Sequence, residues 1–231
     1  TDATYDGLIN LYINRKKLWK HSLVQGNKAE ANAIKNASLI FYTSEWASRN
    51  AVTAYRADAG KIIQLNFGPN LVNNIREKEM RDLIDRRKNK TTKNFLFIGV
   101  DWFRKGGSIA IETISKLNGM GIPSTITIVG CQVPANMRLP SFVVHHPFIS
   151  KTDEKGMNML SDLYSNSDFF LLPTQADCTP VVFSEAASFG IPVITTDVGG
   201  CKSAVIHNET GYCFDKKNFV AEATEKIASL C

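Results

Sequence analysis

The sequence predicts an α/β fold built on a doubly wound, Rossmann-like parallel sheet. From residue 94 onward, short apolar segments of strand length alternate with segments of helix length that are apolar on one face. Strands that are apolar throughout are buried on both faces, as in a parallel sheet covered by helices. Sheets of this kind bind ligands beyond the carboxyl ends of their strands, so the loops that follow the strands are the places to look for function.

The composition is that of an ordinary α/β protein able to bury a sizeable core. Of the 231 residues, 44% are hydrophobic and 21% are charged. No run approaches the roughly 20 apolar residues that a membrane span requires, and the first residues lack a signal-peptide pattern, so we expect a cytoplasmic protein. The five cysteines are odd in number and widely spread, which indicates free thiols and no zinc or other metal site.

The net charge of +5 includes a basic run at residues 86–90. Such a run could attract an anionic lipid surface or a nucleic acid. We interpret it as a solvated helix end, because it has no interleaved aromatic residues and matches no nucleic-acid-binding module. We therefore expect no nucleic-acid partner.

The predicted elements follow the periodicity of the apolar residues. The first region has two helical stretches, the second from about residue 30, then a strand at 39–42, a helix capped by Ser44 and ending near Gly60, a strand at 61–67 and a turn at 68–70. A polar helix at 71–89 follows. Later strands are expected at 94–99, 125–129, 142–146, 168–172, 192–196 and 212–214. Helices are expected at 105–119, 157–166 and 181–189, after Gly200, and up to residue 231.

The first region supplies only about two strands, too few for an independent parallel sheet. We therefore expect the chain to begin inside a domain whose earlier part is absent.

The loop at residues 99–107 is the first candidate binding loop. Gly106 and Gly107 leave the backbone open to close approach, and the start of a helix favours an anion. Arg104 and Lys105 add positive charge, so a phosphate or diphosphate is the expected ligand. A plain strand-to-helix turn with a surface Arg-Lys pair is an equal alternative, and the loop has neither the Walker A nor the GxGxxG spacing.

The loop at residues 173–180 is the second candidate. Asp177 precedes the next helix and Glu185 lies just over one turn inside it, so both carboxylates can face a ligand at the end of the strand. Carboxylates accept hydrogen bonds from vicinal hydroxyls, as offered by a ribose or a hexose. Free N–H groups near Val181 and Val182 can bind phosphate or sugar oxygens. The alternatives are a helix-surface carboxylate for Glu185 and a loop cap for Asp177.

A third loop, at residues 197–200, again joins a strand to a helix. Its glycines permit close approach of a ligand, and a purely structural turn is the equal alternative.

Taken in order, these elements resemble the C-terminal, nucleotide-sugar-binding domain of retaining GT-B glycosyltransferases of the group 1, family 4 type. That family includes many lipopolysaccharide, capsule and mannosyl transferases. The likeness runs from about residue 61 to 214. Its most specific part is the acidic-x7-Glu motif from Asp177 to Glu185, followed by Gly-Ile-Pro-Val-Ile at 190–194. Ser-Glu-Trp at 44–46 and Phe-Gly-Pro-Asn at 67–70 resemble the end of the N-terminal domain and the interdomain linker.

The resemblance implies a domain division and residue roles. Residues 1–68 correspond to the end of the N-terminal, acceptor-binding domain with the linker, and residues 69–231 to the nucleotide-sugar-binding domain. Glu185 is implied to bind the ribose hydroxyls, Asp177 the transferred sugar, and Lys105 the diphosphate. Backbone groups around Thr179, Val181 and Val182, with Gly106 and Arg104, complete the implied donor site.

The implied reaction transfers a sugar from a nucleoside-diphosphate sugar to an acceptor hydroxyl, with retention and without a metal. Lys105, Arg104 and helix N-termini would stabilise the leaving diphosphate. No cofactor is implied beyond the donor. The acceptor would be a glycan, a lipid-linked sugar or a small molecule, and the resemblance allows peripheral membrane association of the full-length protein. We expect the 231-residue chain alone to bind the donor weakly and not to turn over.

The chain departs from the family at three positions. Asp177 replaces the usual glutamate, Val100 replaces a common arginine, and Pro180 stands where a glycine N–H is often found. Val100 and Asp177 keep open a non-catalytic nucleotide-sugar-binding module. Two further alternatives are a sugar-nucleotide epimerase on the same fold and nucleophilic catalysis by Cys178, beside Asp177. The last lacks an obvious histidine partner, and a buried thiol is the favoured interpretation of Cys178.

Overall fold

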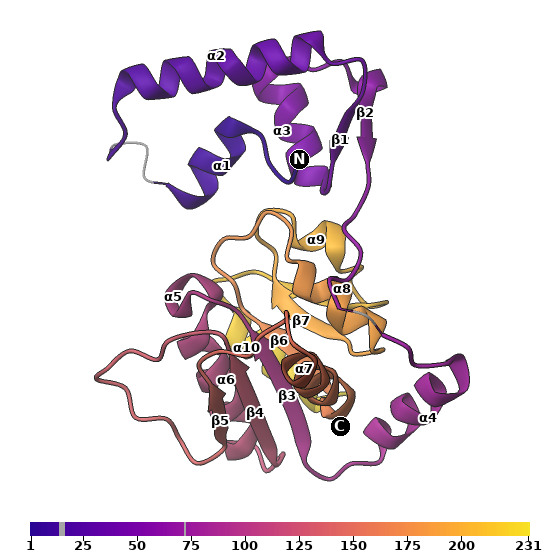
Figure 1. Cartoon of the computed structure of the whole chain (residues 1–231). Helices are drawn as coiled ribbons and strands as arrows, with labels where there is room; N and C mark the ends of the chain where they lie inside the picture. Colours follow the sequence, from indigo (N-terminus) through magenta and orange to yellow (C-terminus); the bar gives the residue numbers. More distant parts are fainter. Residues whose placement is uncertain (14–16, 72) are drawn as a thin grey trace. The chain divides into compact units, whose positions relative to one another are not determined.

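The computed structural model describes residues 1–13, 17–71 and 73–231. By their internal contacts, these residues form two compact units. Unit 1 comprises residues 1–67 with the loops 176–180 and 198–204, and unit 2 comprises 68–175, 181–197 and 205–231. Figure 1 labels most of the elements of both units.

Unit 1 is built from helices around a small parallel sheet. The strands β1 (Ile40–Tyr42) and β2 (Ile62–Gln64) pair in parallel, with Ile40 opposite Ile62. The helices are α1 (Tyr5–Tyr12), α2 (Lys20–Asn36), α3 (Glu45–Tyr55), a short 3-10 turn (Ala59–Lys61) and, in the loop at 198–204, α9 (Cys201–Ala204). Its core comprises Ile34, Ile40, Tyr42, Ala47, Ala51 and Ala57.

Two local predictions for unit 1 have different outcomes. Ser44 caps α3 as predicted, because its Oγ accepts a hydrogen bond of 3.2 Å from the Ala47 N–H. Helix α2, however, begins ten residues before the predicted position. The Tyr5 side chain packs at Gly26, and its hydroxyl donates to the Ser22 carbonyl at 3.2 Å. The first half of α2 has little amphipathic pattern in its sequence, and these tertiary contacts stabilise it.

Unit 2 confirms the doubly wound parallel sheet. Its six strands are all parallel, in the order β5-β4-β3-β6-β7-β8. They are β3 (Lys93–Ile98), β4 (Ser124–Val129), β5 (Val143–His146), β6 (Phe169–Leu172), β7 (Val193–Thr196) and β8 (Gly211–Phe214). The chain builds outward from β3 to β5 on one side and from β6 to β8 on the other, so the strand order reverses between β3 and β6. Ligands bind at this reversal in such sheets.

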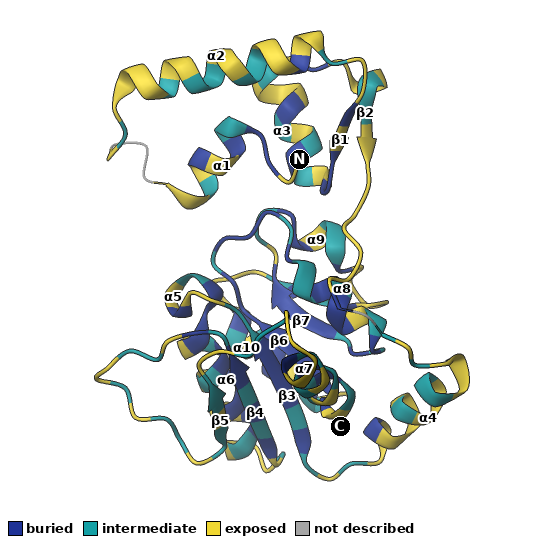
Figure 2. Ribbon diagram, in the orientation of Figure 1, coloured by how far each residue is buried: buried dark blue, intermediate teal, exposed yellow. Residues whose placement is uncertain are grey.

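Four helices of unit 2 pack on the sheet: α6 (Gly107–Gly119), α7 (Glu154–Asn166), α8 (Val181–Ser188) and α10 (Phe219–Ala228). Unit 2 also contains α4 (Glu77–Lys88) and the short α5 (Trp102–Lys105). Central strands β6 and β7 are buried along their whole length, whereas α4 is largely exposed (Figure 2). Among the described residues, no helix is long and apolar enough to cross a membrane.

Helix α4 corrects two predictions. It begins at Glu77, not residue 71, because the Arg76 N–H donates to the Glu79 carboxylate and so caps the helix there. The basic run at 86–90 is also not wholly solvated. Arg87 is buried, and its guanidinium donates to the carbonyl oxygens of Phe189, Gly190, Tyr164 and Ser165 at 2.8–3.4 Å. These carbonyls lie at and just beyond the C-terminal end of α8 and in the last turn of α7.

Candidate functional site

The loop after β3 contains a one-turn helix that the sequence analysis missed. Asp101 caps this helix, α5, by accepting a hydrogen bond of 3.0 Å from the Arg104 N–H. Lys105 is the last residue of α5, and Gly106, at φ +80°, separates α5 from α6. The prediction that Lys105 opens a long helix is therefore wrong: α6 begins two residues later. Lys105 is buried, with only 9% of its surface exposed.

This loop packs directly on the segment that leaves β6. The Gln175 N–H donates to the Arg104 carbonyl at 2.6 Å, and the Thr174 hydroxyl donates to the same oxygen at 3.2 Å. A Cβ at Gly106 would collide with the Pro173 carbonyl oxygen. The backbone from Arg104 to Gly106 therefore lies against residues 173–175, at the strand-order reversal between β3 and β6.

Glu185, on the second turn of α8, is fully buried. Its Oε1 lies 2.5 Å from the Lys151 ammonium, and its Oε2 accepts a hydrogen bond of 2.8 Å from the Tyr164 hydroxyl. The Tyr164 ring stacks on Phe189 with centroids 5.1 Å apart. Burial, followed by the neighbouring carboxylate, raises the pKa of Tyr164. The interpretation of Glu185 as a helix-surface carboxylate is therefore wrong.

Lys151 and Tyr164 were missed by the sequence analysis. Lys151 lies in the loop between β5 and α7, and Tyr164 lies on α7. The rule that selects loops at the carboxyl ends of parallel strands applies equally to the loop after β5, so a lysine there was the signal that could have been used. Of the other implied site residues in unit 2, Val181 and Val182 are half-buried and form the start of α8.

The other implied site residues lie in unit 1. Asp177 is buried, and the Thr179 hydroxyl lies 2.6 Å from that of Thr43. Asp177 lies in unit 1, whereas Lys105 and Glu185 lie in unit 2, so the convergence of all three on one ligand stays a prediction.

The glycines of the third loop serve internal packing. The Gly200 N–H donates to the Asp177 carbonyl at 3.0 Å, and a Cβ at Gly199 or Gly200 would collide with the carbonyl oxygens of Asp177 or Cys178. The close approach that these glycines permit is therefore to the protein's own second loop.

Cys178 has the burial expected of a structural thiol, with 2% of its surface exposed. Its N–H donates to the Tyr12 hydroxyl at 2.9 Å. The hydrogen bonds shown for histidine rings among the described residues join His145 to Cys131 and His207 to Cys213, not to Cys178. Among the described residues, no group of three or more His, Cys, Asp or Glu side chains is arranged to hold a metal ion.

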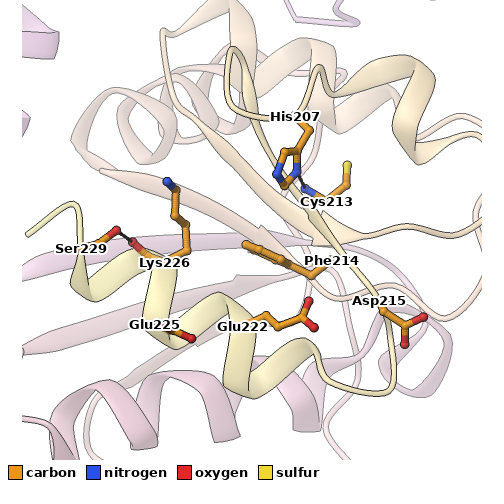
Figure 3. Close-up of a pocket in the computed structure, with 8 residues that line it drawn as sticks. All are labelled: His207, Cys213, Phe214, Asp215, Glu222, Glu225, Lys226 and Ser229. Carbon is orange, nitrogen blue, oxygen red and sulfur yellow. Dashed lines mark hydrogen bonds between the residues drawn. The ribbon is translucent and has the colours of Figure 1, made fainter.

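A separate pocket of about 530 Å³ lies beside β8 and α10 (Figure 3). Its lining carries charges of both signs, and none of the implied site residues belongs to it: the lining residues are His207, Cys213, Phe214, Asp215, Glu222, Glu225, Lys226 and Ser229. Its carboxylates therefore provide controls for substitutions of Glu185.

Comparison with known proteins gives a consistent result. A family model described as glycosyl transferases group 1 matches residues 80–231. The capsular polysaccharide biosynthesis glycosyltransferase CapM of Staphylococcus aureus is 26% identical over 207 residues, which cover 83% of this chain and 52% of CapM. The chain thus spans about half the length of this relative.

Solved structures share the fold. Sucrose-phosphate synthase from Thermosynechococcus elongatus superposes with a TM-score of 0.67 at 20% identity, over 99% of this chain and 57% of that one. Anabaena HepE, solved in complex with UDP and glucose, superposes with a TM-score of 0.60 at 18% identity. The match covers 91% of this chain and 58% of HepE. The strand order and the acidic-x7-Glu motif with its buried Glu185 agree with the family match, which spans about two thirds of the sequence: this chain belongs to the group 1 glycosyl transferases.

Proposed function

We propose that this chain carries the nucleotide-sugar-binding half of a retaining, metal-independent GT-B glycosyltransferase. The observation that carries the proposal is the buried Glu185 carboxylate on the helix that follows β6, the strand at which the sheet order reverses. The turn containing Lys105 packs against the segment that leads towards that helix. The fold shared with HepE, whose solved structure contains UDP and glucose, supports a nucleoside-diphosphate sugar as the donor.

The proposed roles follow from the chemistry of each group. Glu185 binds the ribose hydroxyls, because a carboxylate accepts two hydrogen bonds from a vicinal diol. Lys105, with Arg104 and the backbone at Gly106, binds the diphosphate. The first N–H groups of α8, at Val181 and Val182, and the backbone at Thr179 bind phosphate or sugar oxygens. Asp177 binds hydroxyls of the transferred sugar.

In the proposed reaction, the bond between the anomeric carbon and the diphosphate oxygen breaks, and the acceptor oxygen forms the new bond on the same face. The acceptor hydroxyl gives up its proton to the departing diphosphate oxygen. The nucleoside diphosphate leaves with the bonding electron pair. Positive charge from Lys105 and Arg104 stabilises this developing charge. A reaction of this kind needs no Asp-x-Asp motif to hold a donor-bound metal, and the 231 residues contain none.

The proposed division of labour places donor binding in residues 69–231 and the end of the acceptor-binding half in residues 1–68. The acceptor is then a hydroxyl of a glycan, a lipid-linked sugar or a small molecule.

Ligand-induced stabilisation tests the donor site. UDP, GDP, ADP and their sugars are each titrated in a thermal-shift assay, because a ligand held by the folded state raises the melting temperature. One nucleotide series is expected to stabilise the protein, and Glu185→Gln is expected to abolish that shift. Glu222→Gln, in the pocket beside α10, is the matched control and should keep it. Absence of any nucleotide-dependent shift in the unsubstituted protein would overturn the proposal.

Product analysis separates the transferase from its rivals. The protein, in its full-length form, is incubated with the stabilising donor and a panel of acceptors, with and without EDTA. A new glycosidic bond of the same anomeric configuration as the donor, formed equally with EDTA present, supports the proposal. An altered nucleotide sugar without acceptor consumption indicates an epimerase, and binding without turnover indicates a binding module.

Peripheral membrane association is a further part of the proposal, and exposed residues of unit 1 support it. Trp19 is 72% exposed and Val24 is 62% exposed, close in sequence to the exposed Lys17, Lys20 and Lys28. Between Asp6 and Glu30 the sequence contains no carboxylate. An exposed indole beside lysines suits an anionic bilayer surface.

Vesicle co-sedimentation tests this surface. Binding to vesicles of phosphatidylserine and phosphatidylcholine is expected to fall in Trp19→Ala and at high salt. Binding that is equally strong to pure phosphatidylcholine, or unchanged in Trp19→Ala, would rule this surface out.

A further inference from the structure

Lys151 forms an ion pair with a carboxylate that water does not reach. Its Nζ lies 2.5 Å from Oε1 of Glu185. The Lys151 side chain is 33% exposed, and the Glu185 side chain is 0% exposed. The contact joins a loop at the carboxyl end of β5 to the second turn of α8, across 34 residues of sequence.

The other side of the carboxylate is closed. Oε2 of Glu185 meets the hydroxyl of Tyr164, whose side chain is also fully buried and stacked on Phe189. Of the two groups that contact the carboxylate, Lys151 is the one that reaches solvent. We therefore expect a ligand of Glu185 to approach from the Lys151 side.

Burial of a carboxylate without a cation favours its protonated form. In a protonated carboxyl group one oxygen carries a hydrogen and becomes a donor. Such a group would accept fewer hydrogen bonds and would bind a vicinal diol poorly. Lys151 and Tyr164 are the titratable groups that the described contacts place against this carboxylate. Only Lys151 carries a positive charge.

We propose that Lys151 is a positioning residue of the nucleotide site, which holds Glu185 ionised and oriented for the ribose hydroxyls of the donor. This inference rests on the proposed function, because it assigns Lys151 a role toward the ligand of Glu185. Lys151 acts through Glu185, and contact between Lys151 and the donor is not required.

A double-mutant cycle tests the pair without any ligand. Lys151→Met is expected to lower the folded-to-unfolded equilibrium constant about tenfold, because it leaves an uncompensated buried charge. In a Glu185→Gln background the same substitution should change that constant less than about twofold, since no charge remains to be compensated. Lys155→Met, on the exposed surface of α7, is the matched control. Equal effects of Lys151→Met in both backgrounds would overturn the proposal.

The pH dependence of nucleotide affinity tests the role. The probe is whichever of UDP, GDP and ADP stabilises the protein most, and the quantity is the ratio of the variant Kd to the wild-type Kd at each pH. For Lys151→Met this ratio is expected to be about ten at about pH 6 and to fall as the pH is raised to about 8.5, because a higher pH favours the ionised form of a buried carboxylate that has lost its cation. Lys151→Arg keeps a cation and should give a constant ratio near one.

The outcomes separate this inference from the function on which it rests. A Lys151→Met ratio that is the same at both pH values indicates a purely structural lysine or a direct phosphate contact, and it overturns the proposal while leaving nucleotide binding intact. If the wild-type protein binds none of the three nucleotides, the proposed function fails, and the role of Lys151 fails with it, even if the double-mutant cycle shows coupling.

Discussion

The hydroxyl of Tyr164 donates a hydrogen bond of 2.8 Å to Oε2 of Glu185, and neither side chain is exposed. The two residues come from α7 and α8, helices on either side of β6 in the chain. A buried carboxylate that keeps a fixed donor on one oxygen is restricted in orientation. The position of the proposed ribose-binding group is thus determined by packing before any ligand arrives.

Tyr164→Phe removes this donor while preserving the aromatic stack. We expect the free energy of unfolding to fall by about 1–3 kcal/mol, because a buried acceptor loses a hydrogen bond. Urea denaturation followed by circular dichroism measures the change. Tyr212→Phe, on the half-buried β8, serves as control and should cost less. An unchanged midpoint for Tyr164→Phe would show that the hydrogen bond contributes nothing to stability.

Gly106→Ala tests the contact between the Lys105 turn and residues 173–175. Gly106 has φ +80°, and an added Cβ would collide with the Pro173 carbonyl oxygen, so we expect a loss of at least about 1–2 kcal/mol from the left-handed conformation alone. Gly119→Ala is the control, since its added Cβ would meet no atom within 4 Å beyond the neighbouring residues and the backbone of its own helix. Nucleotide-induced stabilisation should fall in the first variant only. A fully stable, fully binding Gly106→Ala protein would contradict this account of the loop.

Lys105→Met is expected to weaken binding of a nucleoside diphosphate about tenfold or more, because it removes a charge-assisted contact to the phosphates. Affinity for the corresponding nucleoside, which has no phosphate, should hardly change. Isothermal titration calorimetry measures both ligands. Lys116→Met, in the last turn of α6, controls for net charge. If the nucleoside and the diphosphate lose affinity equally, Lys105 supports the fold and does not contact phosphate.

Alkylation distinguishes the buried thiols from the exposed one. Burial, followed by the nearby Asp101 carboxylate, raises the pKa of Cys131 to about 11. At about pH 8 its thiolate is therefore scarcer than in an unfolded chain, and access is blocked as well. Iodoacetamide should modify Cys231, which is exposed, and spare Cys131, Cys178, Cys201 and Cys213. Peptide mass mapping reads out each site. Rapid modification of Cys178 in the native protein would revive a nucleophilic role for that residue.

The sheet and its loops were predictable because they depend on local pattern. Apolar runs such as Phe95–Leu96–Phe97 and Val193–Ile194 are buried strands, and the spacing of Asp177 and Glu185 marked the helix after β6. The one-turn helix α5 was also readable in principle, since Asp101 is a helix-capping residue and Gly106 ends a helix readily.

The remaining features depend on distant partners and leave no local trace. Lys151 meets Glu185 across 34 residues, and Arg87 meets Phe189 across 102. From sequence alone, a basic run is interpreted as exposed to solvent, because the carbonyl groups that accept its hydrogen bonds are not known. The difference between Arg87 and its exposed neighbour Arg86 therefore emerges only once α7 and α8 are in place.

The four hydrogen bonds of Arg87 couple the local unfolding of α4 to that of α7 and α8. Helix α4 is mostly polar and exposed, and on its own it would fray rapidly. Because Arg87 bridges the ends of the helices that bear Tyr164 and Glu185, detachment of α4 leaves carbonyl groups of both without their donor. Amide hydrogen exchange at the last turn of α4 should therefore slow when nucleotide binds, although α4 does not contribute to the proposed site.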